Sequence, residues 1–192
     1  NIKGKDNETW GIGANPINVL SRFNNAGILV DVNNSAVKVN GNVDMDVYGN
    51  GVTVTGDNST VTIAKGGSIT VPAGTDYGYY ALAAYDGTIS MNEQGEENVV
   101  RLDGDVFATD DGTIKLGLAT HDSYLNGIID NGGTVNLTLK NGATWTNEAN
   151  NTRYEQDNED VGYGEKSHIT KLTGGDSFTY AGTIVQTANS KL

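Results

Sequence analysis

The hydrophobic positions of this chain recur as short alternating runs, and the runs themselves repeat. One phrase, a turn residue followed by a β-branched polar residue and apolar residues two positions apart, occurs at residues 59–63, 87–91, 112–116 and 133–137. Its first apolar positions are Val61, Ile89, Ile114 and Val135. Val37 precedes this series by about one period, and Ile184 follows it by about two. Alternation of period two predicts strands, and a repeat of this length predicts a β-solenoid.

The repeat divides the chain into four regions. Residues 1–25 are irregular and are predicted to form an N-terminal cap or a first rung; residues 26–145 carry the rungs. Residues 146–166 lose the pattern and are predicted to be a polar, acidic insertion loop that projects from the stack, and residues 167–192 hold the final rungs up to a truncated end. We expect an all-β protein with about eight irregular coils of about 21–28 residues. Asn-Gly and Asp-Asn pairs, such as those in Gly49-Asn50-Gly51, would supply the positive φ angles of its corners.

Charge and composition exclude several classes of function. The formal net charge is −12, which repels nucleic acid phosphates and anionic membrane surfaces, so we expect no nucleic acid partner. The absence of cysteine rules out disulfides, thiol catalysis and cysteine metal sites. No apolar run approaches the roughly 18 residues of a spanning helix, so the fragment itself is not expected to be membrane-embedded. Because the sequence begins at Asn1 without methionine or signal peptide, we expect it to be part of a longer protein.

The densest acidic cluster on the repeated part is the first candidate for chemistry. Asp103-Gly104-Asp105 lies near Asp110-Asp111, and carboxylates two positions apart on a strand point the same way, as a calcium site would need. The competing interpretation is a solvated turn in an acidic protein. The sequence has neither the nine-residue calcium repeat of glycine and aspartate nor a complete EF-hand loop, so the solvated turn is favoured. We therefore predict no metal and no cofactor.

The sequence gives weaker support for the sets of residues that an enzyme would need. Arg101 beside Asp103 and Asp105 is the local candidate for a polysaccharide lyase, which needs calcium carboxylates and a basic residue. A glycoside hydrolase would need two carboxylates at a fixed separation, and the sequence gives no pair special standing. Gly175-Asp176-Ser177 resembles the surroundings of a nucleophilic serine, with His121 or His168 as the base, but a strand corner explains it better. The sequence therefore predicts a protein that is not an enzyme.

The tyrosines are the favoured candidates for ligand contact. Two groups lie at breaks in the repeat: Tyr77, Tyr79, Tyr80 and Tyr85 at the break of residues 73–85, and Tyr154 and Tyr163 beside the insertion. Tyrosine offers a large, rigid surface with a polar tip, which suits recognition of sugars and proteins. The alternative for Tyr79 or Tyr80 is a place in the core, where a glycine-rich corner leaves space.

Several phrases resemble the passenger domains of bacterial type V autotransporters. They are Val47-Tyr48-Gly49-Asn50-Gly51-Val52, the recurrent Gly-Thr-Ile/Val phrases, and Ser167-His168-Ile169-Thr170-Lys171-Leu172 followed by Gly174-Gly175. The resemblance spans roughly residues 26–192. It implies a right-handed parallel β-helix that is exported and displayed on the outer surface of a diderm bacterium, anchored by an outer-membrane barrel that this chain does not include. No separate protease domain is present, so the resemblance favours an adhesive or aggregative passenger.

The expected function is therefore that of a non-enzymatic cell-surface adhesin fragment. A β-helical stalk would present loops to a surface protein or glycan of a host or neighbouring bacterium, and self-association is a variant of this role. The alternatives are an extracellular polysaccharide lyase or glycoside hydrolase of the β-helix type, and a passive spacer.

Overall fold

The structure is a computed structural model that describes residues 10–11, 26–73, 79–109, 111–150, 166–174, 179–181 and 183–186. Within this part every regular element is a strand, and the all-β prediction is confirmed. None of the described residues forms a helix with the length and apolar character that a membrane span requires.

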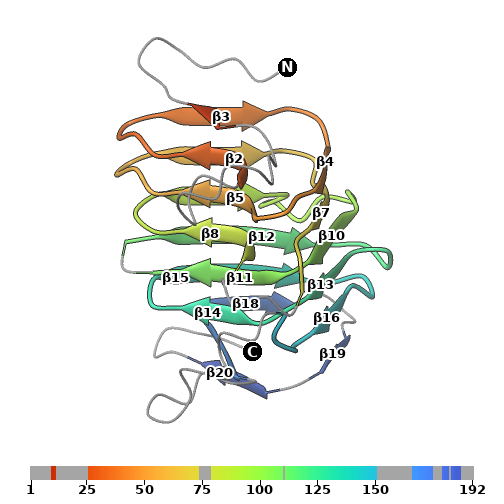
Figure 1. The fold of residues 1–192 in the computed structure, drawn as a ribbon. Helices are drawn as coiled ribbons and strands as arrows, with labels where there is room; N and C mark the ends of the chain where they lie inside the picture. Colours follow the sequence, from red (N-terminus) through yellow and green to blue (C-terminus); the bar gives the residue numbers. More distant parts are fainter. Residues whose placement is uncertain are drawn as a thin grey trace.

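The chain winds as a parallel β-solenoid with three faces, each formed by one sheet (Figure 1). The first sheet contains β2 (Ala26–Val30), β5 (Asn50–Val54), β8 (Tyr80–Ala84), β11 (Asp105–Ala108) and β14 (Ile129–Asn131). The second contains β3 (Ala36–Val39), β6 (Thr60–Ile63), β9 (Thr88–Met91), β12 (Thr113–Leu118), β15 (Thr134–Leu139) and β18 (Lys171–Gly174). The third contains β4 (Val43–Asp46), β7 (Gly67–Thr70), β10 (Val100–Asp103), β13 (Tyr124–Asn126), β16 (Thr144–Thr146) and β19 (Thr179–Ala181).

Three short strands lie at the two ends of the stack. The strand β1 (Trp10–Gly11) pairs antiparallel with β2, the first strand of the first coil, and is the only described part of the predicted N-terminal cap. At the other end, β17 (Lys166–Ile169) pairs in parallel with β20 (Thr183–Gln186). Residues 1–9, 12–25, 151–165 and 187–192 lie outside the described residues.

The described strands complete about five turns, from β2 to β16, so the expected number of about eight is too high. The reason is that excursions lengthen individual turns. The turn that takes Val52 to Leu82 and the turn that takes Gly67 to Val100 are both longer than the turn from Val37 to Val61. The longest turns between paired strands take Leu137 to Leu172 and Trp145 to Tyr180. A uniform period therefore overestimates the number of coils.

The repeated phrase forms the second sheet in the predicted register. Val37 pairs with Val61, Val61 with Ile89, Ile89 with Ile114 and Ile114 with Val135. The expected continuation at Ile184 is wrong, because Ile184 pairs with Ser167 in the β17–β20 pair, while β18 continues the second sheet. The stretch from Val135 to Ile184 thus covers one long turn and the beginning of the next.

The corner residues adopt the predicted left-handed conformations at some positions. Asn58, in an Asp-Asn pair, has φ 54°, and Asn141-Gly142 has φ 56° and 77°. Gly67 has φ 119°, and a Cβ there would lie 1.9 Å from the Val43 carbonyl oxygen of the neighbouring coil. The prediction for Gly49-Asn50-Gly51 is wrong in part, because Asn50 and Gly51 already belong to strand β5.

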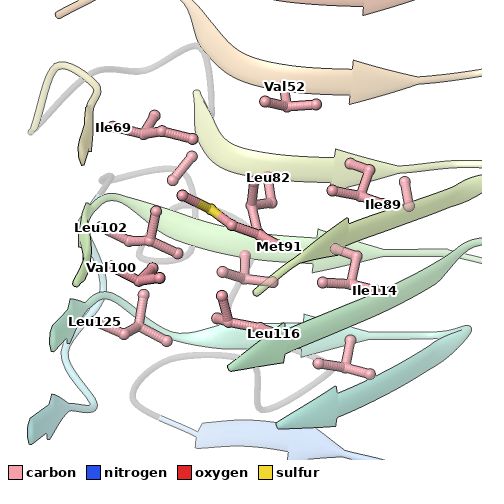
Figure 2. Close-up of a cluster of buried hydrophobic side chains, with 14 of the residues drawn as sticks. Val52, Ile69, Leu82, Ile89, Met91, Val100, Leu102, Ile114, Leu116 and Leu125 are labelled. Carbon is pink, nitrogen blue, oxygen red and sulfur yellow. The ribbon is translucent and has the colours of Figure 1, made fainter. Parts of the chain in front are cut away.

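The core runs through the interior of the solenoid. Figure 2 shows side chains from all three faces directed into it, including Leu82 of the first sheet, Ile114 of the second and Leu125 of the third. These three side chains are completely buried. Each buried side chain of this size contributes roughly 1.5–3 kcal/mol, and stacking in register lets every coil share its apolar face with its neighbours.

The first sheet is buried on both sides along β2, β5 and β8. Leu29, Thr53 and Ala83 pair in register on the side away from the core, yet each is at most 7% exposed. Further along the same outer side, Tyr80, Ala83 and Ile128 form a second buried cluster, with Phe107 and Tyr85 packed against it. The exposed outer surfaces of the solenoid therefore lie mainly on the other two sheets.

The beginning of the predicted insertion does not project from the stack. Residues 147–150, here called the strap, run back against the first sheet after β16. The Asn150 backbone N–H donates to Asp105 Oδ1 at 2.9 Å, and its side-chain amide donates to the Pro72 carbonyl at 3.3 Å. The Ser167 hydroxyl donates to the Asn147 side-chain oxygen. The strap therefore links coils that are not neighbours in the stack.

Candidate functional site

The outer side of the third sheet carries two columns of polar residues. Register places Asp44, Ser68, Arg101, Tyr124 and Thr144 in one column, and Asp46, Thr70, Asp103, Asn126 and Thr146 in the other. We call these two columns together the polar strip. Between the columns, the alternate residues point inward, among them the buried side chains of Ile69, Leu102, Leu125 and Trp145. The strip arises because successive strands repeat the pattern polar, apolar, polar, and a strand sends alternate side chains to opposite faces.

Asp103 is the centre of a hydrogen-bond network on this strip. The Tyr124 hydroxyl donates to its Oδ2 at 2.7 Å, and the Asn126 side-chain amide donates to its Oδ1 at 2.8 Å. Both partners come from β13, the next strand in the stack, and Asp103 itself is half-buried. Because both carboxylate oxygens are engaged, the network fixes the orientations of Tyr124 and Asn126 without any ligand.

The protonation state of Tyr124 follows from the same contacts. Burial raises the pKa of the Tyr124 hydroxyl above 10.0, and the hydrogen bond to Asp103 and its negative charge raise it further. The positive charge of Arg101 acts in the opposite direction. A raised pKa means that Tyr124 stays protonated at neutral pH and continues to donate to Asp103.

Arg101 is the positively charged residue of the strip. Its Nε donates to the Asp122 carbonyl at 3.3 Å. The corner that carries this carbonyl is itself held by buried Ser123, whose hydroxyl accepts the Val100 N–H at 3.0 Å and bonds to Thr120 at 2.8 Å. Arg101 is exposed, and within the described part of the chain its two Nη nitrogens have no hydrogen-bond partner. They are therefore available to an incoming acceptor.

Two hollows meet at Arg101. The larger, of about 420 Å³, is lined by Arg101, His121, Asp122, Ser123, Tyr124, Asn126 and Thr144. The smaller, of about 240 Å³, is lined by Asn42, Val43, Asp44, Gly67, Ser68, Val99 and Arg101. Together they extend along the third sheet from β4 to β16, with Arg101 at the point where they join.

The predicted acidic cluster is not brought together. Gly104 lies between β10 and β11 with φ 151°, so Asp103 and Asp105 belong to different sheets. Asp105 is completely buried and accepts the Ile128 N–H at 2.9 Å as well as that of Asn150. The rule that carboxylates two positions apart share a face fails here because a corner intervenes. Asp110 lies outside the described residues.

Other predicted chemical groups are also separated. Among the described residues, no group of three or more histidine, aspartate or glutamate side chains could hold a metal ion. His121 lies in the corner after β12, highly exposed, and its Nδ1 is 3.5 Å from Asp122 Oδ1. His168 lies in strand β17, and Gly175-Asp176-Ser177 falls outside the described part.

Of the six predicted tyrosines, the three that the structure describes lie away from the polar strip. Tyr79 and Tyr80 are each only 3% exposed, as the alternative interpretation had it; Tyr80 stacks on Phe107 with ring centroids 4.7 Å apart. Tyr85 is half-buried and meets the edge of the same ring at 5.4 Å. Tyr77, Tyr154 and Tyr163 lie outside the described residues. A ligand-binding role for these six residues stays a prediction.

Sequence reasoning missed Tyr124 and Asn126 as partners of Asp103. The signal that could have found them is the recurring pair of polar residues around one apolar residue, as in Arg101-Leu102-Asp103 and Tyr124-Leu125-Asn126. These two triplets lie one turn apart and pair in register. Tyr48 was not among the tyrosines predicted to contact a ligand, although it is 55% exposed. Its ring centroid lies 6.1 Å from that of Tyr79.

Comparisons with known proteins provide no relative from which a function could be transferred. No family model, curated protein or solved structure matches this sequence. The functional conclusion therefore rests on the solenoid and on the geometry of the polar strip.

Proposed function

We propose that this chain is a non-enzymatic recognition module, a stiff solenoid that presents the polar strip of its third sheet to a ligand on another cell. The observation that carries the proposal is the arrangement of Arg101 between two hollows, beside the Asp103–Tyr124–Asn126 network. Side chains that are already oriented lose less conformational entropy when a ligand binds. A passive spacer has no use for such an arrangement.

The hydrogen bonds of the strip support binding more than catalysis. Asp103 accepts from Tyr124 and Asn126, and Asp44 accepts from the Ser68 hydroxyl at 2.7 Å. Each carboxylate keeps further lone pairs that can accept from a ligand, while the donors from the neighbouring strand hold it in place. Their role in the resting protein is to set the geometry of neighbouring side chains, as in a binding surface.

The cellular setting is the second part of the proposal. The solenoid is the fold that the resemblance to autotransporter passenger domains implies, and the net charge of −12 suits a surface that stays solvated. We place the chain on the outer surface of a diderm bacterium, as a segment of an adhesive or aggregative passenger. Its partners are surface glycans or proteins of a host or of neighbouring bacteria, including other copies of the same chain.

A binding array tests this function. The purified chain is applied to immobilised extracellular-matrix proteins and glycans, with and without calcium, in parallel with Arg101→Ala and with Lys38→Ala. Lys38 is a suitable control because it is exposed on the second sheet, away from the strip. We expect saturable binding that Arg101→Ala weakens and Lys38→Ala leaves unchanged. If Arg101→Ala bound every ligand of the array as tightly as the wild type, the strip would not be the binding surface.

A further inference from the structure

The donors and acceptors of the polar strip indicate which kind of ligand it can hold. Asp44, Asp46 and Asp103 on the strip, with Asp122 beside it, supply carboxylate oxygens. Against these four acidic groups stands one cationic side chain, Arg101. The remaining strip positions are hydroxyls and one amide, which can both donate and accept. The strip therefore offers many neutral hydrogen-bonding partners and an excess of negative charge.

This balance discriminates between charged ligands. A polyanion, such as a sulfated or uronate polymer, would meet four carboxylates for each guanidinium and be repelled. A polycation would be attracted by the other carboxylates, but at the junction of the two hollows it would meet the Arg101 guanidinium, and both oxygens of Asp103 there already accept from Tyr124 and Asn126. It would therefore have to cross the strip without occupying its centre. A ligand rich in hydroxyl groups can donate to the remaining carboxylate oxygens and accept from the Arg101 nitrogens.

The direction of the strip sets the shape of such a ligand. Ser68, Arg101, Tyr124 and Thr144 stand one strand apart along the solenoid axis. With a strand spacing of about 4.8 Å, the column from Ser68 to Thr144 is about 14 Å long. That length matches a trisaccharide to tetrasaccharide lying parallel to the axis. The half-buried ring of Tyr124 forms part of the wall of the larger hollow, where its apolar surface can contact a sugar ring.

We infer that the polar strip binds a linear neutral glycan that lies along the solenoid axis, with one part in each hollow and Arg101 contacting the chain between them. The inference rests on the proposed function, because it specifies the ligand of the same site. Ser68 and Asp44 contact the end of the glycan in the smaller hollow, and Tyr124, Asn126 and Thr144 contact the part in the larger hollow. Arg101 lies between the two parts of the glycan and contacts both of them.

Calorimetric titration with defined oligosaccharides tests this inference. The probes are cellooligosaccharides and N-acetylchitooligosaccharides, each from the disaccharide to the hexasaccharide, with a heparin oligosaccharide and oligolysine as charged comparisons. We expect affinity for at least one neutral series to rise up to the trisaccharide or tetrasaccharide and then level off. Added salt should change this affinity little, because no net ion pairing is involved.

Two variants assign the binding to the strip. Arg101→Ala should weaken the neutral tetrasaccharide by about tenfold or more, because a charged hydrogen-bond donor is lost. Tyr124→Phe keeps the ring but removes the donor to Asp103, so a smaller loss is expected. Lys38→Ala, in a separate hollow of the second sheet, should bind like the wild type. Far-ultraviolet circular dichroism confirms that each variant is folded.

The outcomes separate the inference from the proposed function. Strip-dependent binding of heparin, oligolysine or an array protein, without binding of any neutral oligosaccharide, would overturn the neutral-glycan inference and keep the recognition function. Neutral binding that Arg101→Ala does not weaken would also overturn it, because the glycan would then lie elsewhere. Absence of any ligand that depends on the strip would overturn both.

Discussion

At the scale of single residues, Asp103 shows how the meaning of a side chain depends on its place in the coil. In sequence it belongs to an acidic cluster with Asp105, two positions away. In the solenoid the corner at Gly104 sends Asp103 to the surface of the third sheet and Asp105 into a buried position on the first. The partners of Asp103 are instead Tyr124 and Asn126, one turn later. No local pattern reveals such partners until the length of the turn is known.

The raised pKa of Tyr124 gives a prediction at this scale. Since the pKa is higher in the folded protein than the ordinary 10.0, protonated Tyr124 stabilises the fold at pH values below 10.0. This contribution is lost as the pH rises through the raised pKa. In Asp103→Asn we expect the pKa of Tyr124 to fall toward its ordinary value, because the hydrogen bond to a carboxylate and its charge are both removed.

Nuclear magnetic resonance of ring-labelled tyrosine measures this shift, and Tyr124→Phe identifies the resonance among the nine tyrosines. Asp46→Asn, in the same column of the strip as Asp103, is the matched control and should leave the titration in place. An unchanged Tyr124 titration in Asp103→Asn would show that the network does not determine its protonation.

At the scale of elements, the sequence predicts the second sheet far better than the third. The repeated phrase marks four strands of the second sheet, β6, β9, β12 and β15, because a turn residue, a β-branched residue and buried apolar residues recur together there. The third sheet has no such phrase, and its turns vary widely: the turn from Gly67 to Val100 is much longer than the turn from Val43 to Gly67. Its strands share only a polar–apolar–polar triplet, which the second sheet also shows, as in Thr60-Val61-Thr62, so the triplet alone does not align the columns of outward side chains. The candidate site lies on this less regular sheet.

The strap provides a prediction for an element. Asp105 accepts the N–H groups of Ile128 and Asn150 at 2.9 Å each, so Asp105→Ala leaves both donors without that acceptor. The unmet buried donor of Ile128 costs about 1–3 kcal/mol, and the part-buried donor of Asn150 adds less, so we expect the free energy of unfolding to fall by about 2–4 kcal/mol. Denaturant unfolding measures the loss, and hydrogen exchange should accelerate at Asn150.

Asp86→Ala serves as the control for the strap, since Asp86 is exposed at a corner of the same solenoid. Its unfolding free energy should change by no more than about 0.5 kcal/mol. Equal stabilities of Asp105→Ala and Asp86→Ala would contradict the role assigned to the Asp105 contacts.

At the scale of the whole molecule, stability depends on an unbroken interior ladder. Ile114 is completely buried and stands between Ile89 and Val135 in register. Each coil buries its apolar side only against its neighbours, so a cavity in one coil weakens the contacts of two others. The strap adds contacts between distant coils, as between Asn150 and Pro72, and these should make unfolding more cooperative than in a solenoid with neighbour contacts alone.

Ile114→Ala tests this dependence. We expect the free energy of unfolding to fall by about 2–5 kcal/mol, the usual cost of removing a large buried aliphatic side chain. Thr113→Ala changes the preceding residue of the same strand, whose side chain is half-buried on the outer face, and should cost much less. Similar losses in the two variants would mean that the interior ladder is not the main source of stability.

The most direct test of the recognition function is a hydrogen-exchange footprint of the full chain, measured with and without the tightest ligand from the binding array. We expect slower exchange concentrated in β7, β10, β13 and the corner of residues 119–123, with little change in the second sheet. The same experiment with Arg101→Ala should show a weaker footprint at equal ligand concentration. Protection confined to other faces of the solenoid would contradict the claim that the polar strip is the binding surface.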